Sequence, residues 1–297
     1  MKYLVTGTAG FIGSHLVEHL AKDPTNKIFA IDKKEFDFKL DNVEEIVDDL
    51  KNPFHKLPEV DVVIHLAAFN GTKHFYTKSL DVIRDNILPT LNLIEFYKGL
   101  PPKRFVYAGT PESTVVSTEY FDYPLPTDEK APIGVIDVQN KRWSYANSKA
   151  LGEQAVIASD LPYTIIRYNN VYGPRQVDHF VSEFYERVLQ GDYTLYGWKN
   201  TRTFIYIDDA IKATQMLLDT DKSFNEIYNL GGEKETTIKE VGETILDLAG
   251  IISELNLEDA PEGSTMRRWP DTTKLKAHTG FKQSVDLKEG LRKTLEL

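Results

Sequence analysis

The chain has 297 residues, of which 41% are hydrophobic, enough for a sizeable core in one or two domains. Its net charge of −10 argues against nucleic acid or an anionic membrane as the main partner, and the absence of cysteine excludes a disulfide framework and thiol catalysis. Because it has neither a signal-peptide pattern nor a run of about 18 apolar residues, we expect a cytoplasmic protein without a membrane-spanning helix.

The N-terminal segment joins an apolar strand pattern to an amphipathic helix pattern through a glycine-rich turn. Gly7, Gly10 and Gly13 mark this turn in the spacing Gly-x-x-Gly-x-x-Gly. The glycines let the backbone turn tightly and approach a pyrophosphate, and the helix behind them directs its free N–H groups at the phosphates. An ordinary strand-to-helix turn is the alternative, but the residues that follow favour a dinucleotide site.

An acidic residue follows at the distance that a ribose-binding group requires. Asp32 ends the next predicted strand, residues 27–32, and lies 25 positions after Gly7, close to the spacing of about 20 residues that is typical of such sites. A carboxylate there accepts hydrogen bonds from both ribose hydroxyls and repels a 2′-phosphate. We therefore predict NAD rather than NADP, although Lys33 and Lys34 leave some tolerance for a phosphate open.

The remaining pattern alternates strands and helices as far as residue 168. The predicted elements are a third buried strand at 60–66, a helix at 79–98, strands at 104–108 and 163–168, and a helix at 145–159 between them. The helix at 79–98 carries five apolar residues on one face, namely Leu80, Ile83, Ile87, Leu91 and Ile94. This alternation predicts an α/β fold, a Rossmann-type doubly wound parallel sheet.

Beyond residue 169 the units become irregular, with short strands and helices near 178–190, 237–250 and 287–295. This change predicts a smaller, mixed α/β substrate-binding lobe over the carboxyl ends of the strands, where such folds bind ligands. We expect residues 1–168 to form the NAD-binding domain. Residues 169–297 would form mainly the substrate-binding lobe, with segments near 200–230 returning to the first domain.

Tyr145 and Lys149 are four residues apart and share one face of the predicted helix. A free tyrosine, with a pKa of about 10, is a poor base near neutral pH, but a neighbouring ammonium and the positive nicotinamide ring favour the phenolate. The pair predicts a general base that takes a proton from a sugar hydroxyl. Thr110, just past the strand at 104–108, is a candidate hydroxyl donor to the reacting oxygen; a simple turn threonine is the alternative.

Taken together, the motifs resemble the NAD-dependent epimerase/dehydratase family of nucleotide-sugar enzymes, within the extended short-chain dehydrogenase/reductase superfamily. The resemblance covers essentially the whole chain. It rests on Thr-Gly-Thr-Ala-Gly-Phe-Ile-Gly at 6–13, Asp-Asp-Leu at 48–50, His-Leu-Ala-Ala at 65–68, Ser-Tyr-Ala-Asn-Ser-Lys-Ala-Leu-Gly-Glu at 144–153, Arg-Tyr-Asn-Asn-Val-Tyr-Gly-Pro-Arg at 167–175 and Arg-Thr-Phe-Ile-Tyr-Ile-Asp-Asp at 202–209.

The resemblance implies which residues contact the cofactor and the substrate. The NAD contacts would be Gly7, Gly10, Phe11, Ile12, Gly13, Asp32, Asp49, Leu50, Leu66, Ala67, Ala68, Tyr145 and Lys149. A nucleotide-diphosphate sugar would be held by Asn170 and Arg202, with Arg267 or Arg268 as a second phosphate-binding arginine; a solvated surface charge is the alternative for these last two. We expect no metal site, because the sequence shows no cluster of metal-ligating residues.

The implied reaction is oxidation of the sugar, usually at C4, to a transient ketone. Tyr145 would be the base, Lys149 its electrostatic partner and Thr110 a supporting hydroxyl, and NAD would be regenerated within the cycle. The leading prediction is a nucleotide-sugar epimerase acting through a 4-keto sugar. Family members often dimerise through the two helices at 79–98 and 144–159, and we therefore predict a homodimer.

Glu112 keeps open an alternative within the family. In 4,6-dehydratases the threonine is followed by Asp-Glu, in uronic-acid decarboxylases by Ser-Glu, and here by Pro111 and Glu112. A proline cannot protonate a leaving hydroxyl, so dehydration is disfavoured, while a dehydratase or decarboxylase using Glu112 remains the rival prediction. A loop role for Glu112 and a non-catalytic NAD-binding protein are further alternatives. The long segment at 113–142 is expected to cover the site and to influence substrate choice.

Overall fold

A parallel sheet of seven strands forms the centre of the structure, a computed structural model that describes residues 1–54, 56–135, 137–261 and 263–296. The strand order is β11-β6-β5-β4-β1-β2-β3, and every neighbouring pair is parallel. The strands are β1 (Lys2–Thr6), β2 (Lys27–Asp32), β3 (Val43–Val47), β4 (Val62–His65), β5 (Arg104–Gly109), β6 (Tyr163–Tyr168) and β11 (Glu226–Leu230). The predicted doubly wound parallel sheet is confirmed.

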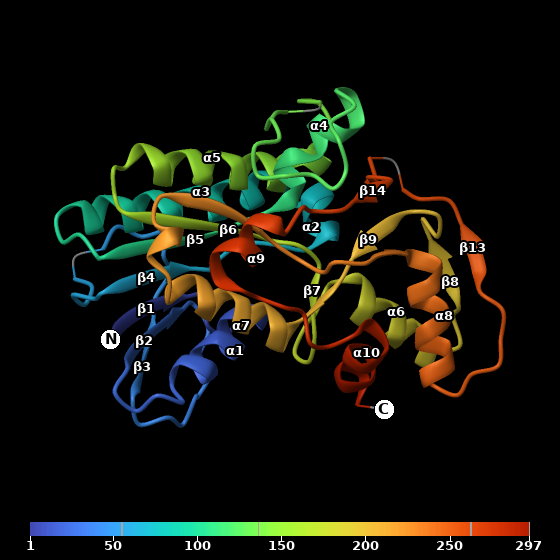
Figure 1. Ribbon diagram of the computed structural model, residues 1–297, viewed down its shortest axis with the longest axis horizontal. Helices are drawn as coiled ribbons and strands as arrows, with labels where there is room; N and C mark the ends of the chain where they lie inside the picture. Colours follow the sequence, from blue (N-terminus) through green and yellow to red (C-terminus); the bar gives the residue numbers. More distant parts are fainter. Residues whose placement is uncertain (55, 136, 262, 297) are drawn as a thin grey trace.

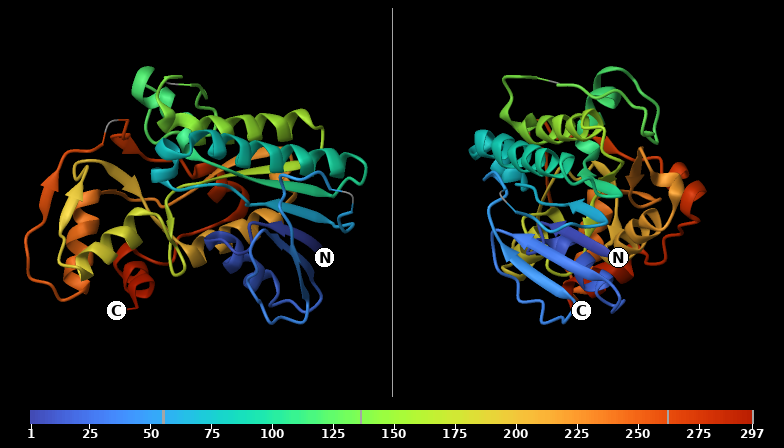
Figure 2. Two further views of the ribbon diagram at one scale, coloured as in Figure 1. Left: turned by 180° about the vertical axis from the view of Figure 1, so that it is seen from behind. Right: turned by 90° about the vertical axis from the view of Figure 1, so that its left-hand side faces the viewer.

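Helices cover both faces of this sheet (Figure 1). On one side α3 (Ser79–Lys98) and α5 (Ser144–Ala158) lie side by side, and on the other lie α1 (Phe11–Leu20) and α7 (Ile207–Leu218) (Figure 2). Because all seven strands are parallel, their carboxyl ends meet at one edge. The loops that leave this edge therefore converge on a single crevice.

A smaller lobe of helices and short strands lies beyond that edge (Figure 1). Its elements are α6 (Phe180–Leu189), α8 (Ile238–Leu248), α10 (Leu287–Leu295), β7 (Val171–Tyr172), β8 (Thr194–Tyr196), β9 (Thr201–Thr203), β10 (Ile205–Tyr206), β12 (Glu235–Thr237), β13 (Asn256–Glu258) and β14 (Arg267–Arg268). We propose to divide the chain at residue 168, and to count β11 with the first domain because it lies in the large sheet.

Several short elements complete the chain. They are α2 (Thr72–Thr77), α4 (Val115–Tyr120), α9 (Thr273–Thr279) and the 3-10 turns η1 (Pro111–Thr114), η2 (Lys141–Trp143) and η3 (Asp221–Ser223). Two of these, η1 and η2, flank the segment at 113–142. This segment is tied down rather than extended, since Thr127 pairs with Pro270 and the Glu129 carboxylate accepts the Asn229 N–H at 2.9 Å.

Strand β3 was not predicted from the sequence. The strand predicted at 60–66 as the third is therefore the fourth, β4. Two glutamates interrupt the apolar pattern of β3, and the strand pairs only with β2 at the edge of the sheet. The Glu45 side chain fixes the loop before β3, because its carboxylate accepts the backbone N–H groups of Phe36, Asp37 and Phe38. An edge strand with one solvated face shows little of the apolar run that identifies a central strand.

The helix predicted at 79–98 has the predicted bounds, but the apolar face named for it is largely exposed. Leu80 is 73% exposed and Leu91 41%, and of the five residues only Ile94 is buried. The side that packs on the sheet instead contains Val82, Leu93 and other residues of mixed polarity. Of this apolar stripe, only Ile94 is a buried member of the core of the described chain.

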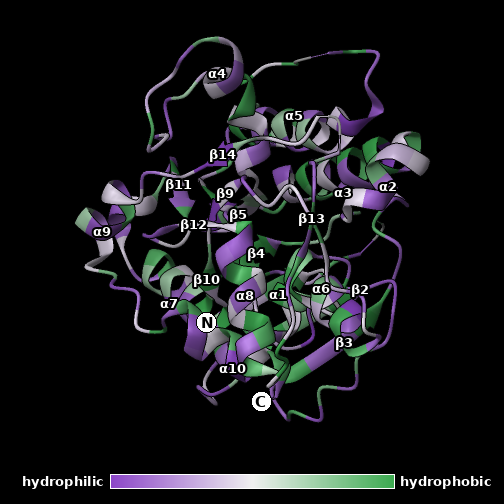
Figure 3. Cartoon of the chain, turned by 90° about the vertical axis from the view of Figure 1, so that its right-hand side faces the viewer, coloured by the Kyte–Doolittle hydropathy of each residue, from purple (hydrophilic) through white to green (hydrophobic). Residues whose placement is uncertain are grey.

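Hydrophobic residues gather on the central strands and on the helices that pack against them (Figure 3). One cluster lies between the sheet, α1 and α7 and extends into the smaller lobe. A second lies between the sheet, α3 and α5. Within the four described ranges, no helix is both long and apolar enough to cross a membrane.

Candidate active site

A cavity of about 930 Å³ opens at the carboxyl ends of the strands, between the sheet and the smaller lobe. It is lined by nearly all of the residues that the sequence predicted for the cofactor, the chemistry and the substrate. These are Gly7, Gly10, Phe11, Ile12, Gly13, Asp32, Asp49, Leu50, Leu66, Ala67, Ala68, Thr110, Glu112, Tyr145, Lys149, Asn170 and Arg202. The parallel topology thus brings together segments that are far apart in the sequence.

The glycine turn leaves no room for side chains. A Cβ on Gly13 would lie 2.2 Å from the Gly7 carbonyl oxygen, and one on Gly7, which has a φ of +75°, would lie 2.7 Å from the Ala67 backbone nitrogen. The backbone is therefore free to approach a ligand directly, and α1 begins immediately behind it at Phe11. This geometry fits the pyrophosphate of a dinucleotide.

Asp32 lies next to the glycine turn and is part of it. One carboxylate oxygen accepts the Ala9 N–H at 3.0 Å, and the other accepts the Lys34 N–H, also at 3.0 Å. A carboxylate oxygen can accept more than one hydrogen bond, so both atoms keep the capacity to accept ribose hydroxyls. Asp32 therefore fits the ribose of NAD while also fixing the shape of the loop.

Tyr145 lies at the start of α5, with its ring against Phe75 and its hydroxyl at Thr110. The Tyr145 and Phe75 rings are stacked, with centroids 4.8 Å apart and an angle of 10° between their planes. Burial raises the pKa of Tyr145, the Glu112 charge raises it further, and the hydrogen bond from Thr110 and the Arg268 charge lower it. These side chains alone do not make Tyr145 a base at neutral pH, and the positive ring of the cofactor must supply the difference.

Lys149 is buried one helical turn further along α5, with its ammonium 4.2 Å from the centre of the Tyr107 ring. Burial lowers its pKa to about 7, and the Glu153 carboxylate on the same helix opposes this shift. A lysine with a pKa of about 7 is only partly protonated at neutral pH, and the predicted role of Lys149 as electrostatic partner of Tyr145 belongs to its protonated form.

Glu112 is the centre of a buried charge cluster. The Arg142 guanidinium donates to both of its oxygens at 2.9 and 3.1 Å, and Arg268 donates to one of them at 3.3 Å. Although burial alone would raise the pKa of Glu112, the two arginines bring it down to about 2. Glu112 is therefore an ionised carboxylate and a weak base, and it is more than a loop residue.

Arg202 adds a third guanidinium to the same wall of the cavity. It donates to the backbone carbonyls of Thr201 and Thr265 at 2.7 and 2.8 Å, and it has no carboxylate partner within the described residues. Burial and the neighbouring positive charges of Arg268 and Arg142 lower its pKa to about 9. With one carboxylate against three guanidiniums, this wall is suited to bind an anion.

The second phosphate-binding arginine requires a correction. Arg267, the first of the two predicted candidates, is absent from the cavity lining and forms an exposed ion pair with Glu235 at 2.7 Å. Its neighbour Arg268 lines the cavity instead, and its buried Nε atom has no hydrogen-bond partner in the described part of the chain. Adjacent residues on a strand point to opposite faces, and the sequence does not show which one faces the ligand.

The segment at 113–142 contributes less to the cavity than predicted. Of its described residues, Arg142 alone lines the cavity. Sequence reasoning missed Arg142, although a cation three residues before Tyr145 was a signal that could have been used. Ile136, which falls within this segment, lies outside the described residues.

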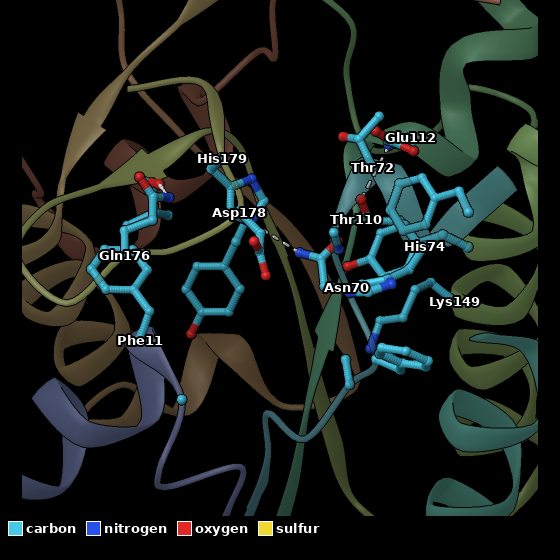
Figure 4. A pocket seen from close by; sticks show the side chains of 18 of the residues that line it. Phe11, Asn70, Thr72, His74, Thr110, Glu112, Lys149, Gln176, Asp178 and His179 are labelled. Carbon is cyan, nitrogen blue, oxygen red and sulfur yellow. Dashed lines mark hydrogen bonds between the residues drawn. The ribbon is translucent and has the colours of Figure 1, made fainter. Parts of the chain in front are cut away.

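A further group of cavity residues was also missed (Figure 4). Asn70 follows β4 and His179 precedes α6, and the two side chains meet at 3.3 Å between Nδ2 and Nε2. The Asn70 oxygen accepts the Gly71 N–H, so its amide nitrogen donates to His179, and the histidine proton is on Nδ1. Nearby, His74 of α2 has a buried Nδ1 with no partner among the described residues.

No set of three metal-ligating side chains occurs within residues 1–54, 56–135, 137–261 and 263–296. The arrangement can instead bind a dinucleotide, place a tyrosine hydroxyl beside a reacting oxygen and hold an anion. Each function comes from a different group of segments around one cavity.

Comparison with known proteins agrees with this geometry. A family model described as the NAD dependent epimerase/dehydratase family matches residues 3–231. A UDP-N-acetyl-alpha-D-glucosaminuronate decarboxylase of Bacillus cytotoxicus is 35% identical over 99% of this chain and 96% of its own length. A putative UDP-glucose 4-epimerase of Methanocaldococcus jannaschii is 30% identical over 98% of this chain and 96% of its own length. The UDP-glucuronic acid 4-epimerase of Bacillus cereus, solved with UDP-glucuronic acid and NAD, has a TM-score of 0.89 and 27% identity over 100% of this chain and 98% of its own.

Proposed function

The chain belongs to the NAD-dependent epimerase/dehydratase family, and on that premise we propose that it oxidises C4 of a nucleotide-diphosphate sugar acid and then releases CO2 from C6. The family consists of NAD-dependent nucleotide-sugar epimerases, dehydratases and decarboxylases. The observation that carries the choice among them is the ionised Glu112 carboxylate between Arg142 and Arg268, in the same cavity as Tyr145.

The first step is the removal of the C4 hydroxyl proton by Tyr145. Thr110 orients the phenol through a hydrogen bond, and Lys149 lies one helical turn away on the same face. NAD, when bound, accepts the hydride from C4. We propose that Gly7, Gly10 and Gly13 admit its pyrophosphate and that Asp32 binds its ribose.

The arrangement around Glu112 disfavours 4,6-dehydration. Dehydration needs a base for the C5 proton and an acid for the leaving hydroxyl. The two arginines make Glu112 a weak base, with a pKa of about 2, and the acid position is occupied by Pro111. Neither group is therefore suited to its part in removing water.

The same arrangement favours loss of CO2. A substrate carboxylate at C6 is attracted into the cavity by the net positive wall, but there it lies against the fixed negative charge of Glu112. Once C4 is a ketone, the C5–C6 bond can break, and its electron pair moves into an enolate. The carboxylate leaves as neutral CO2, which relieves its charge repulsion with Glu112. The Tyr145 hydroxyl then donates a hydrogen bond to the enolate oxygen, and C5 takes a proton from water. Return of the hydride to C4, together with return of the proton from Tyr145 to the C4 oxygen, would restore the C4 hydroxyl and the oxidised cofactor, so that the net change is loss of CO2.

The test is product mass after incubation of the purified protein with NAD and UDP-glucuronic acid, UDP-N-acetylglucosaminuronic acid or UDP-glucose. We expect both uronic acids to lose the mass of CO2 and UDP-glucose to react poorly. An unchanged mass with a new C4 configuration would overturn decarboxylation, and loss of water would overturn the assignment of Glu112.

A 4-epimerase acting through a transient 4-keto sugar is the second candidate. Two observations favour it. Pro111 offers no proton for C5 after loss of CO2, and the UDP-glucuronic acid 4-epimerase of Bacillus cereus is similar in structure, with TM-scores of 0.86 to 0.89 for three of its crystal structures. An epimerase needs only Tyr145 and rotation of the ketone before it is reduced again. Nuclear magnetic resonance of the sugar product distinguishes the two, because only epimerisation retains C6.

We also propose a homodimer through α3 and α5. Leu80 and Leu91 on α3, and Leu151 at 53% exposure on α5, leave apolar side chains exposed on two helices that lie side by side. Replacing Leu91 and Leu151 by glutamate should halve the mass in light scattering, whereas Val138→Glu, at an exposed apolar site on another segment, should not. A concentration-independent monomer mass for the unmodified chain would contradict the proposal.

A further inference from the structure

The short helix α2 contributes a buried aromatic ring to the back of the site. Phe75 is only 2% exposed, and its ring is stacked on the Tyr145 ring with an interplanar angle of 10°. Its backbone carbonyl accepts a hydrogen bond from Ser144, the residue before Tyr145. Both the ring and the backbone of Phe75 therefore fix the first turn of α5, where the base is located.

Phe75 also contacts the charge cluster. The Arg142 guanidinium lies over the Phe75 ring at 5.4 Å from its centre, and over the Trp143 ring at 5.1 Å. The same guanidinium donates to both oxygens of Glu112, as described above. A guanidinium within about 6 Å of a ring centre is attracted to it, so Arg142, Phe75 and Tyr145 form one continuous contact.

Phe75 lies between the other two side chains, since its ring contacts both the Tyr145 ring and the Arg142 guanidinium. Arg142 and Phe75 are buried, and both line the cavity together with Tyr145. Any shift of the guanidinium toward a ligand anion therefore changes the support of the Phe75 ring. Because the Tyr145 ring rests flat against Phe75, its hydroxyl changes its position relative to Thr110.

We propose that Phe75 is a positioning residue that couples the anion held by Arg142 to the orientation of Tyr145, so that oxidation at C4 is fast only when the sugar carries its acid group. The inference rests on the proposed function, in which Tyr145 is the base. Phe75 touches neither the C4 oxygen nor the charge of the substrate. It acts through its two neighbours.

Comparing the rates with an acidic and a neutral substrate distinguishes coupling through Phe75 from a role in packing alone. We expect Phe75→Leu to lower the rate of hydride transfer from UDP-glucuronic acid by about 10²-fold, the cost of a displaced catalytic group. Its rate with neutral UDP-glucose should change by less than about threefold, so that preference for the acid collapses. A ring needed only for packing would lower both rates by the same factor, and this outcome would overturn the proposal.

Two further variants make the test specific. Phe96→Leu removes a partly buried ring on α3, outside the cavity, and should leave the preference for the acid intact even where it lowers the melting temperature. Arg142→Met should collapse the preference as Phe75→Leu does, and the double variant should be little worse than either single one. Additive losses in the double variant would show two independent roles and contradict the coupling.

Tyr145→Phe separates failure of the inference from failure of the proposed function. If Tyr145→Phe is inactive while Phe75→Leu keeps the preference for the acid, the base assignment stands and the coupling is wrong. If Tyr145→Phe retains full activity, the proposed function itself is wrong. Rates are followed by the absorbance of the reduced nicotinamide in a single turnover.

Discussion

The two ends of the cavity hold their ligands by different physical means. At the cofactor end, backbone atoms and missing side chains make the site: a Cβ on Gly13 would lie 2.2 Å from a carbonyl oxygen. At the sugar end, buried charged side chains make it: Glu112 is held by Arg142 and Arg268, with Arg202 beside them. The first end is sensitive to volume and the second to charge and pH. Tyr145 lies where they meet.

The largest expected effect is at this meeting point. Tyr145→Phe removes the hydroxyl that takes the C4 proton and should lower kcat by about 10³-fold, while NAD and substrate binding stay nearly unchanged. Product formation and the affinity for each ligand are the measurements. Tyr97→Phe is the matched control, since among the described residues its hydroxyl donates only to the Pro58 carbonyl, and neither residue lines the cavity. Similar losses in both variants would remove Tyr145 from the chemistry.

Acid should weaken the charge cluster at the sugar end. The pKa of Glu112 is depressed to about 2, whereas an unfolded glutamate has a pKa of about 4.3. Its contribution to stability is therefore complete above about pH 4.3 and is lost as the pH falls toward about 2, amounting to about 3 kcal/mol in total. Denaturant unfolding between about pH 6 and pH 3 should show this dependence. Glu112→Gln should lack it, and identical slopes would refute the pairing.

Glu112→Gln should also split the kinetic constants for a sugar acid. Without the negative charge the three arginines bind the substrate carboxylate more tightly, so KM should fall. The repulsion that favours CO2 loss disappears with it, and kcat for decarboxylation should drop by about 10²-fold. Steady-state kinetics with the mass of the product measures both. A rise in KM with an unchanged kcat would mean that Glu112 only shapes the loop.

At the cofactor end the expected change is smaller and concerns binding alone. Gly13→Ala places a methyl group against the Gly7 carbonyl and should lower the affinity for NAD by at least about tenfold, because the loop must shift. Calorimetry measures the affinity. Gly99→Ala is the control, because the φ of −82° at this position suits alanine and the new Cβ would lie 3.6 Å from the Phe96 carbonyl oxygen, an ordinary contact distance. Equal NAD affinity in both variants would show that the turn tolerates volume.

The same contrast explains how much the sequence could predict. The glycine turn, Asp32 and the helix that carries Tyr145 lie in contiguous segments with fixed spacing, so a pattern identifies them. The sugar end is formed by Glu112, Arg142 and Arg268, which belong to three distant segments, and only the fold brings their charges together. For the same reason the sequence did not show that Arg268, rather than Arg267, lines the cavity.

Helical periodicity also failed to identify the face of α3 that packs on the sheet. Leu80 and Leu91 satisfied a helical pattern, yet the helix turns Val82 and Leu93 toward the sheet. A pattern reports which side chains share a face and not which neighbour covers that face. The edge strand β3 failed in the opposite way, because its glutamates hid a strand that pairing with β2 stabilises.

The hydrogen bonds of Asp32 limit how the cofactor preference of this protein could be changed from NAD to NADP. Its two oxygens accept the backbone N–H groups of Ala9 and Lys34, so the carboxylate is a structural part of the loop as well as the ribose ligand that we propose. Exchanging it for a small residue, the obvious way to admit a 2′-phosphate, would also release both ends of the turn. An NADP-dependent version would therefore require a new acceptor for these two N–H groups, and redesign must treat residues 9 and 34 together with residue 32.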